Sequence, residues 1–461
     1  MHYRGFSRGQ WLCCIALFSL GLPIALSSGV PAIHAQTPEP NQTVSLGLAE
    51  AKELALKNNL QTVLAKEGIA QAKGQKGISL SALLPSIGAT AYQSNLTSNL
   101  AASGIPVESF GFPAFIGPFN RFDARFQMVQ SVFNLSAIRR YQAAGYGLEL
   151  ARQRQRLAAQ QVTAATVISY LTTLEAEQAV NAAKANVQLA ETLLSLAINQ
   201  KETGVAAGID VARAETRLAN QRVQLAQAQS TLDMARLDLL RIVNGVRGES
   251  LSGTVVLRDQ MTITPEPGRD ADKAIQQALI DRVEVSIAEQ ELRIAEAQVK
   301  AAKSDLFPSI SVFGDYGSSG LKPNEVNYPT RSIGVRLDIP VFSGGRTQAE
   351  IHIASSRVRE SDALLKDVRA TVERDVRQSL LEVKTREEQV RSAESAVSLA
   401  NRELVLAQDR FNNGVADNVE VVTAQTALEN ARRSLVSSLY QFNLARLNLA
   451  SALGHVEDFR L

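Results

Sequence analysis

The chain has 461 residues, enough for two or three ordinary domains or for one extended architecture. Its 48 Lys and Arg nearly balance its 46 Asp and Glu, and no block of like charge occurs, which argues against a nucleic-acid-binding protein. Two cysteines and four histidines exclude a disulfide framework and offer little for a metal site, so we expect no metal and no cofactor.

Residues 1–35 are predicted to be a cleaved secretory signal peptide. Arg4 and Arg8 provide its positive start, and the mostly apolar stretch 11–26 is too short for a comfortable membrane span. Both cysteines fall inside this leader. After it, no stretch of about 18 apolar residues occurs, so we expect no membrane-spanning helix.

The spacing of the prolines predicts where the helices lie. Proline breaks a helix, and the chain has none between Pro118 and Pro265 and none after Pro340. The proline-free stretches are rich in good helix formers, and 136–202 alone would run about 100 Å, which is too long for a globular domain. Their many small residues suit closely packed coiled coils, although an ordinary helical bundle is the alternative. We predict helices over 45–82, 136–202, 209–244, 270–305, 345–411 and 418–452.

Two segments between the helices alternate apolar and polar residues with period two, the pattern of a half-buried strand. They predict two β-hairpins, 85–133 and 308–342, the first with a long loop over roughly 97–118. The apolar side includes Phe122, Phe126, Ile333, Val335 and Leu337, and the polar side Arg121, Asp123, Arg125, Arg336 and Asp338.

The chain repeats itself. Leu-Leu-Pro-Ser-Ile at 83–87 recurs as Leu-Phe-Pro-Ser-Ile at 306–310, and Gly-Val-Ala at 204–206 recurs at 414–416. Such matches in constant order indicate a tandem duplication. The first repeat is 36–245 with the long helix pair 136–244, a connecting segment at the equator of the molecule is 246–268, the second repeat is 269–455 with the pair 345–452, and 456–461 is a tail with no evident role.

Four strands cannot close a barrel alone, because the smallest common barrels have about eight. The apolar faces could cover an internal core and leave the charges in solvent. A secreted chain with apolar-out, polar-in strands also suits an outer-membrane barrel shared between subunits. Three copies would give twelve strands, with the five charged residues facing the lumen, the five apolar ones facing lipid, and the helices continuing the pore in the periplasm.

The motifs together resemble the TolC-like outer-membrane efflux protein family, over essentially the whole chain after the leader. They are the duplicated Pro-Ser-Ile junction, Val-Phe-Ser-Gly-Gly-Arg at 341–346, and a Gly-Val turn followed by Asp210 or Glu420 before a valine. The resemblance implies a mainly α homotrimer with a twelve-stranded transmembrane β-barrel and an α-helical coiled-coil tunnel. It further implies a passive exit duct of a tripartite efflux or type I secretion system, with an inner-membrane pump and a periplasmic adaptor as partners.

The turns after the long helices carry glycine, which permits a left-handed helix end. Glycines at 344–345 are likewise expected to bend the chain where strand becomes helix. The resemblance adds that the two turns form a periplasmic tip that docks on the adaptor. This tip would comprise Gly204, Val205, Ala206, Gly208, Gly414, Val415, Ala416 and Asn418.

Asp210 and Glu420 begin the shorter helices, where an acid interacts favourably with the helix dipole. They are also the candidate entrance gate, because threefold symmetry would gather three carboxylates whose like charges repel. Glu420 matches the first of two acidic positions that the resemblance implies. Thr423 occupies the second, so strong cation selectivity is not expected.

No catalytic constellation stands out. The two histidines beyond the leader, His352 and His455, have no His or Cys within helical reach, and no nucleophile motif, P-loop or dinucleotide fingerprint occurs. We therefore expect no enzyme and no nucleic-acid partner, but an outer-membrane channel with a periplasmic helical extension. A periplasmic adaptor and a structural coiled-coil scaffold are the alternatives, and the transported substrate cannot be read from the residues.

Overall fold

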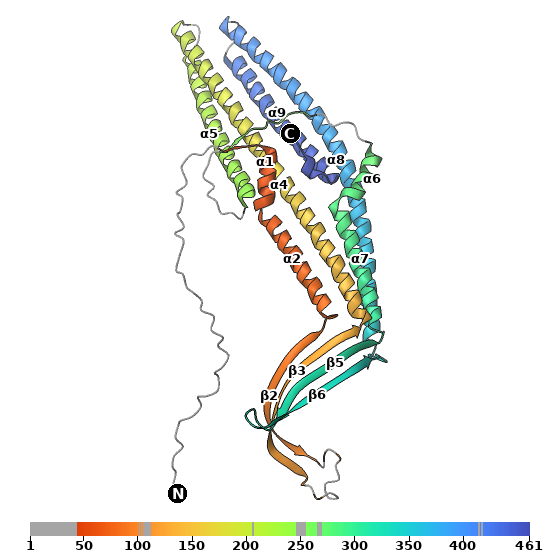
Figure 1. Cartoon of the computed structure of the whole chain (residues 1–461). Coiled ribbons are helices and arrows are strands. Elements are labelled where there is room, and N and C mark those ends of the chain that lie inside the picture. The colour runs from red at the N-terminus through yellow and green to blue at the C-terminus, as the bar shows by residue number, and fades with distance from the viewer. Residues whose placement is uncertain are drawn as a thin grey trace, which may run out of the picture. The chain divides into compact units, whose positions relative to one another are not determined.

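A computed structural model describes residues 44–461 except 101, 103, 105–110, 112, 205–206, 246–254, 265–269, 414 and 416–417. The chain is mostly helical, with one curved sheet (Figure 1). The first repeat holds α1 (Leu48–Asn58), α2 (Leu60–Ser81), α4 (Leu135–Glu202) and α5 (Gly208–Asn244). The second holds α6 (Ala271–Asp281), α7 (Val283–Ser304), α8 (Arg346–Asn412) and α9 (Asn418–Ala452). None of the described helices is both long and apolar enough to cross a membrane.

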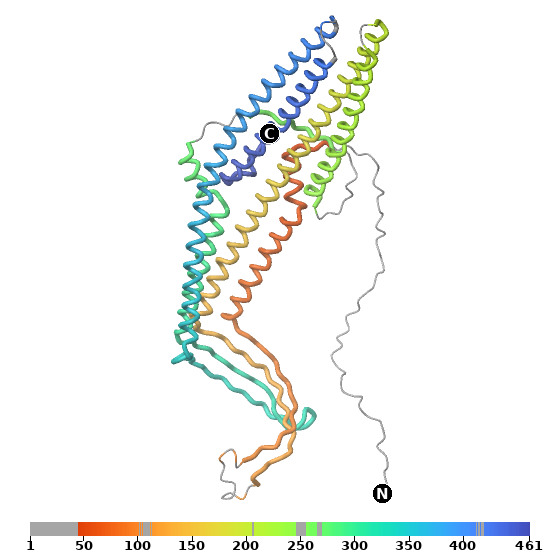
Figure 2. Tube along the Cα trace, turned by 180° about the vertical axis from the view of Figure 1, so that it is seen from behind, coloured from red at the N-terminus to blue at the C-terminus, as the bar shows by residue number. Residues whose placement is uncertain are grey.

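Four antiparallel strands form the sheet, in the order β2 (Ser86–Asn99), β3 (Phe115–Phe133), β5 (Ser309–Gly320) and β6 (Asn327–Asp338). The β3–β5 ladder joins the hairpin of one repeat to that of the other. Each strand continues into a helix: β2 follows α2, β3 precedes α4, β5 follows α7 and β6 precedes α8. Figure 2 shows the four strands leaving the same end of these helices.

The predicted helices 45–82 and 270–305 are each broken in two, which corrects the prediction. The breaks fall at Asn59 (ψ 138°) and Arg282 (ψ 125°), single residues with extended backbone. The Asn59 side chain accepts the Gln61 N–H and so starts the next helix. Neither proline nor glycine marks these breaks, so residue pattern alone did not reveal them.

A tightly packed glycine follows the last helix of each repeat. It lies against the break between the first two helices of the same repeat. A Cβ on Gly245 would lie 2.1 Å from the Asn58 carbonyl oxygen, and one on Gly454 would lie 3.1 Å from the carbonyl carbon of Asp281. Both glycines have positive φ, 48° and 83°. The duplication therefore reproduces a joint as well as the element order.

A two-stranded parallel sheet, β1 (Val44–Leu46) with β4 (Val255–Leu257), was not predicted. Fully buried Tyr170 on α4 anchors it, since its hydroxyl lies 2.7 Å from an Asp259 carboxylate oxygen and 3.0 Å from the Leu46 carbonyl oxygen. The same Asp259 oxygen accepts the Leu48 N–H at 2.7 Å. Burial, with the Asp259 carboxylate beside it, raises the pKa of Tyr170 and keeps the phenol neutral.

Residues 456–461 pack into the core, although the sequence suggested no role for them. Val456 and Phe459 are buried in an apolar cluster with residues of α1, α4, α5 and α9. The Lys52 ammonium of α1 donates to the carbonyl oxygens of Glu457 and Phe459 at 2.8 and 3.0 Å. The Arg446 guanidinium of α9 lies over the Phe459 ring, 5.4 Å from its centre. The segment thus ties the first repeat to the second.

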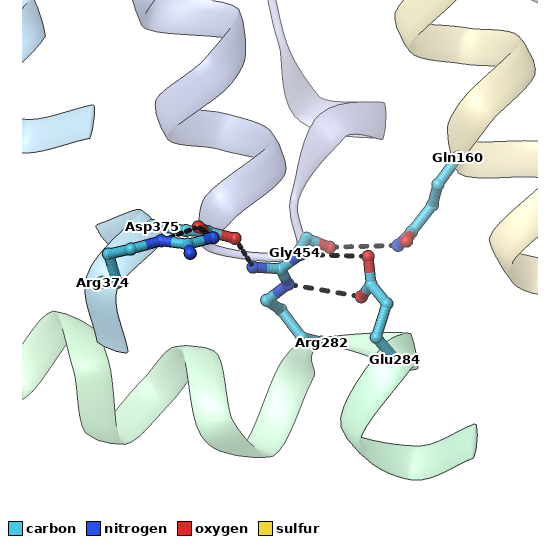
Figure 3. A network of polar contacts seen from close by, with 6 residues as sticks. All are labelled: Gln160, Arg282, Glu284, Arg374, Asp375 and Gly454. Carbon is cyan, nitrogen blue, oxygen red and sulfur yellow. Dashed lines mark hydrogen bonds and ion pairs between the residues drawn. The ribbon is translucent and has the colours of Figure 1, made fainter. Parts of the chain in front are cut away.

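An ion-pair network surrounds the α6–α7 break (Figure 3). Arg282 pairs with Glu284 and with Asp375 of α8, each at 3.0 Å, and Arg374 adds a contact to Asp375 at 2.9 Å. Burial alone would raise the pKa of Asp375, but the hydrogen bonds from Arg374 and Arg282 outweigh it and lower that pKa below its usual value. The carboxylate therefore holds α8 to the start of α7 in its ionised form.

We predict that Asp375→Asn lowers the stability of the chain by about 1 kcal/mol at neutral pH. A depressed carboxyl pKa contributes stability above its unfolded value, about 3.9, and that contribution is lost as pH falls through the folded pKa. Thermal unfolding in detergent at pH 7 and pH 3 measures this, with exposed Asp367→Asn on the same helix as control. If Asp375→Asn lost the same amount of stability at both pH values, the ionised Asp375 carboxylate would not be the stabilising form.

Candidate functional site

The two faces of the sheet have opposite character. The strand register places the apolar residues Phe122, Phe126, Ile333, Val335 and Leu337 on one face and the charged residues Arg121, Asp123, Arg125, Arg336 and Asp338 on the other. On the apolar face Ile333 is 86% exposed, Val335 69% and Phe126 64%. Large apolar side chains gathered in this way on one exposed face mark contact with lipid or protein rather than with water.

The polar face carries a network that crosses three strands. Arg125 of β3 pairs with Asp123 on its own strand and with Asp315 of β5 at 3.2 Å. The Ser319 hydroxyl donates to Asp123 at 2.7 Å, and the Ser332 hydroxyl of β6 donates to Asp315. Asp123 has no exposed side-chain surface, so its charge depends on these partners. The network couples the two hairpins on the polar side.

Sequence reasoning found only part of this network. Alternation along one strand identifies which residues share a face, and so indicated Asp123 and Arg125. Asp315, Ser319 and Ser332 were missed, because their role depends on the register between strands that lie far apart in the sequence. Arg336, which was predicted, lies over the Phe313 ring at 5.4 Å.

The turn between α4 and α5 ends the first long helix in a left-handed residue, Gly204 at φ 79°. Its N–H donates to the Lys201 carbonyl at 3.1 Å, and Gly208 begins α5. At the second turn the exposed Val415 donates its N–H to the Arg410 carbonyl at 2.9 Å, and Asn418 begins α9. Four residues predicted for the tip lie outside the described residues: Val205, Ala206, Gly414 and Ala416.

The two candidate gate residues differ in their surroundings. The Asp210 carboxylate accepts the Ala207 N–H at 3.1 Å, and Arg213 lies 3.6 Å away, so it caps the start of α5. Glu420 instead forms an ion pair with Arg410 at 3.0 Å, across the turn from α9 to α8. This pair compensates the Glu420 charge within one copy, a feature that the repulsion hypothesis had not included.

An ion pair that the sequence did not reveal joins the two coiled-coil pairs. Arg217 of α5 meets Glu429 of α9 at 2.5 Å, and both side chains are largely buried. On the other side of α5, Arg222 reaches Glu191 of α4 at 3.1 Å. Arg217 and Glu429 belong to different repeats, so no helical periodicity could have paired them.

The exposed apolar face of the sheet and the long helices that continue its strands are typical of a class of protein, the membrane channels. Within that class, the model of the outer membrane efflux protein family matches residues 52–245 and 274–455, and the chain belongs to this family. It is an outer-membrane channel protein with a periplasmic helical part. The adaptor and scaffold alternatives fall away, because the family match covers both repeats.

Individual relatives agree with this family. The alkaline protease secretion protein AprF of Pseudomonas aeruginosa is 22% identical over 421 residues, 90% of this chain and 85% of AprF. The probable efflux pump outer membrane protein TtgC of Pseudomonas putida is 26% identical over 313 residues, 66% of this chain and 63% of TtgC. The crystal structure of the CmeC outer membrane channel of Campylobacter jejuni shares the fold, with TM-score 0.74 and 20% identity over 89% of this chain and 86% of CmeC.

We predict that Arg125→Met weakens the sheet, because it leaves the Asp123 carboxylate buried without its cation. The unfolding temperature of the sheet should fall by several degrees. The change of gel mobility on heating in detergent measures this temperature. Arg121→Met is the matched control, since Arg121 is exposed on the same face of the same strand. An equal fall in unfolding temperature in both variants would show that the network does not stabilise the sheet.

Proposed function

We propose that three copies of this chain close a twelve-stranded barrel and that the barrel and its helices form a passive exit duct. The carrying observation is that the sheet has two free edges: among the described strands, β2 pairs only with β3 and β6 only with β5. Unpaired backbone groups are not tolerated in hydrocarbon, so each edge needs a partner. The alternating strand directions make β6 of one copy antiparallel to β2 of the next.

The number of copies follows from the width that a duct needs. Barrels of about eight strands are filled by their own side chains, so two copies would leave no water channel. Three copies are the smallest number that leaves an open lumen. Arg121, Asp123, Arg125, Arg336 and Asp338 would line it, and Phe122, Phe126, Ile333, Val335 and Leu337 would face outer-membrane lipid.

The long helices support the periplasmic half of the proposal. α4 has 68 residues and α8 has 67, so each runs about 100 Å from its strand. The sequence has no nucleotide-binding motif, which favours a duct driven by an inner-membrane pump through a periplasmic adaptor. The names of TtgC and AprF, an efflux pump protein and a secretion protein, support coupling of this kind. The two turns at the helix ends would dock on the adaptor, through Gly204, Val205, Ala206, Gly208, Gly414, Val415, Ala416 and Asn418.

Conductance across a planar lipid bilayer tests the duct directly. The full-length protein purified from outer membranes should give stable channels in its trimeric fraction. Recovery in the soluble fraction, or absence of channels from a folded trimer, would contradict the proposed function.

The same recordings test the entrance. We propose that Glu420 and its partner Arg410 hold the α8–α9 turn in a narrow arrangement. Glu420→Ala should then raise conductance several-fold. Asp210→Ala, recorded beside it, measures whether the carboxylate that caps the start of α5 contributes as well. Equal conductance in wild type and Glu420→Ala would contradict a role in the entrance and leave Glu420 only its favourable interaction with the start of α9.

A further inference from the structure

One charged side chain stands on the apolar face of the sheet. Arg331 of β6 lies opposite Tyr316 of β5, which in turn lies opposite Phe126 of β3, so the three share this face. Arg331 is exposed there, and Tyr316 and Phe126 are each 64% exposed. Every other Arg, Lys, Asp or Glu of the four strands lies on the opposite face. A lipid-facing arginine costs free energy within the hydrocarbon, so its depth and its counter-ion decide what it can do.

Arg331 has no counter-ion among the described residues, with which it forms neither an ion pair nor a hydrogen bond. The proposed barrel supplies none either, because β6 would lie beside β2 of the next copy. The residues that β2 presents on this face are uncharged. They are Ile87, Ala89, Ala91 and Gln93. Closing the barrel as proposed would therefore leave Arg331 as an uncompensated cation on the outer surface.

The depth of Arg331 follows from the apolar residues between it and α8. Every second residue in that direction is apolar and exposed: Ile333, Val335, Leu337, Ile339 and Val341. Val341 lies ten residues from Arg331, which is about 25 Å of height for an extended chain tilted by about 40°. The apolar band of outer-membrane barrels has this height. Since the helices are periplasmic, Arg331 would lie at the opposite boundary, at the level of the outer-leaflet headgroups.

A hollow of about 500 Å³ opens beside Arg331, on the side away from the helices. The row of residues one step further out along the four strands has short side chains, and these line the hollow. They are Ala91, Ala124, Ser318 and Pro329. Phe126 and Tyr316 line it on the side toward the hydrocarbon, and aromatic side chains gather at the interfaces of such barrels. A cation, an aromatic rim and room for a group larger than a phosphate ion thus lie together.

We propose that Arg331 and this hollow bind a lipid with a phosphorylated sugar headgroup from the outer leaflet, one in each copy of the chain. The Arg331 guanidinium donates two parallel hydrogen bonds to a phosphate, and the sugar ring lies in the hollow. The acyl chains run over Ile333 and Val335 into the hydrocarbon. This inference rests on the proposed function, because it needs the sheet to stand in the membrane, and it adds what the outer surface of the barrel binds.

Charge and position together select this occupant. A lipid without phosphate would leave the guanidinium unpaired at the edge of a medium of low dielectric constant, which is unfavourable. A free phosphate ion would pair with Arg331 but would leave the apolar residues beside it uncovered. A phosphorylated lipid satisfies both. The hollow, with Ser318 among its lining residues, adds room for a sugar ring.

Native mass spectrometry of the full-length protein in detergent, titrated with bisphosphorylated lipid A, tests the site. The wild-type trimer should bind one lipid A per copy. Arg331→Gln should weaken binding about tenfold, because it removes the charge-assisted hydrogen bonds to phosphate, and Arg331→Lys should lose less. Arg121→Gln is the matched control, since it removes the same charge from an exposed position on the opposite face of the sheet and should bind as the wild type does. The same spectra show whether each variant is still a trimer.

Several outcomes would overturn the site. Equal affinities of Arg331→Gln and Arg121→Gln would do so, as would equal binding of dephosphorylated lipid A by the wild type. Displacement of lipid A by inorganic phosphate at the same concentration would show an ion site rather than a lipid site, and equally tight binding of phosphatidylglycerol would exclude a role of the sugar. A trimer that conducts across a bilayer but binds no lipid A would overturn this inference alone, whereas recovery of the chain in the soluble fraction would overturn the duct as well.

Discussion

The four-stranded sheet cannot stand alone in a bilayer, because its two edge strands carry backbone groups that lipid cannot satisfy. This single constraint links the parts of the structure. The edges call for neighbouring copies, and the opposed faces decide which side meets lipid and which meets water. Since each strand continues into a helix, closing the sheet as proposed would also bring the long helices into a ring.

The chain builds this arrangement from two copies of one structural unit. Each repeat supplies a short helix, a 22-residue helix, a hairpin, a long helix and a shorter one. The Gly245 and Gly454 joints and the matched burial of α4 and α8 show that packing was duplicated along with sequence. What differs between the repeats is what covers them. α7 of the second repeat packs between α4 and α8, whereas its counterpart α2 packs extensively on α4 alone.

The sequence predicted much of this because the strongest signals are local. Proline-free runs indicated the long helices, and period-two alternation placed Phe122 and Asp123 on opposite faces, as the strand register has them. Features that depend on distant residues were missed. The short strands β1 and β4 pair although the whole helical part of the first repeat separates them, and Arg217 meets Glu429 of the other repeat. The helix breaks at Asn59 and Arg282 need only one extended residue each, too small a signal for composition to show.

Several charged side chains of the described residues are paired within the chain. Arg125 serves two carboxylates on the polar face of the sheet, Arg282 serves two at the α6–α7 break, and Arg410 meets Glu420 at the turn. On the polar face of the sheet, three arginines (Arg121, Arg125 and Arg336) balance three aspartates (Asp123, Asp315 and Asp338), which would give the proposed duct a weak charge preference. Any discrimination between substrates would then come from the pump.

Counting strands tests most directly the proposal that three copies share one closed barrel. An electron cryomicroscopy reconstruction of the protein in lipid nanodiscs would count them. We expect a threefold particle with twelve strands in one ring and β6 of each copy beside β2 of the next. A ring of another strand number, or a single chain whose sheet edges stay unpaired in lipid, would contradict it.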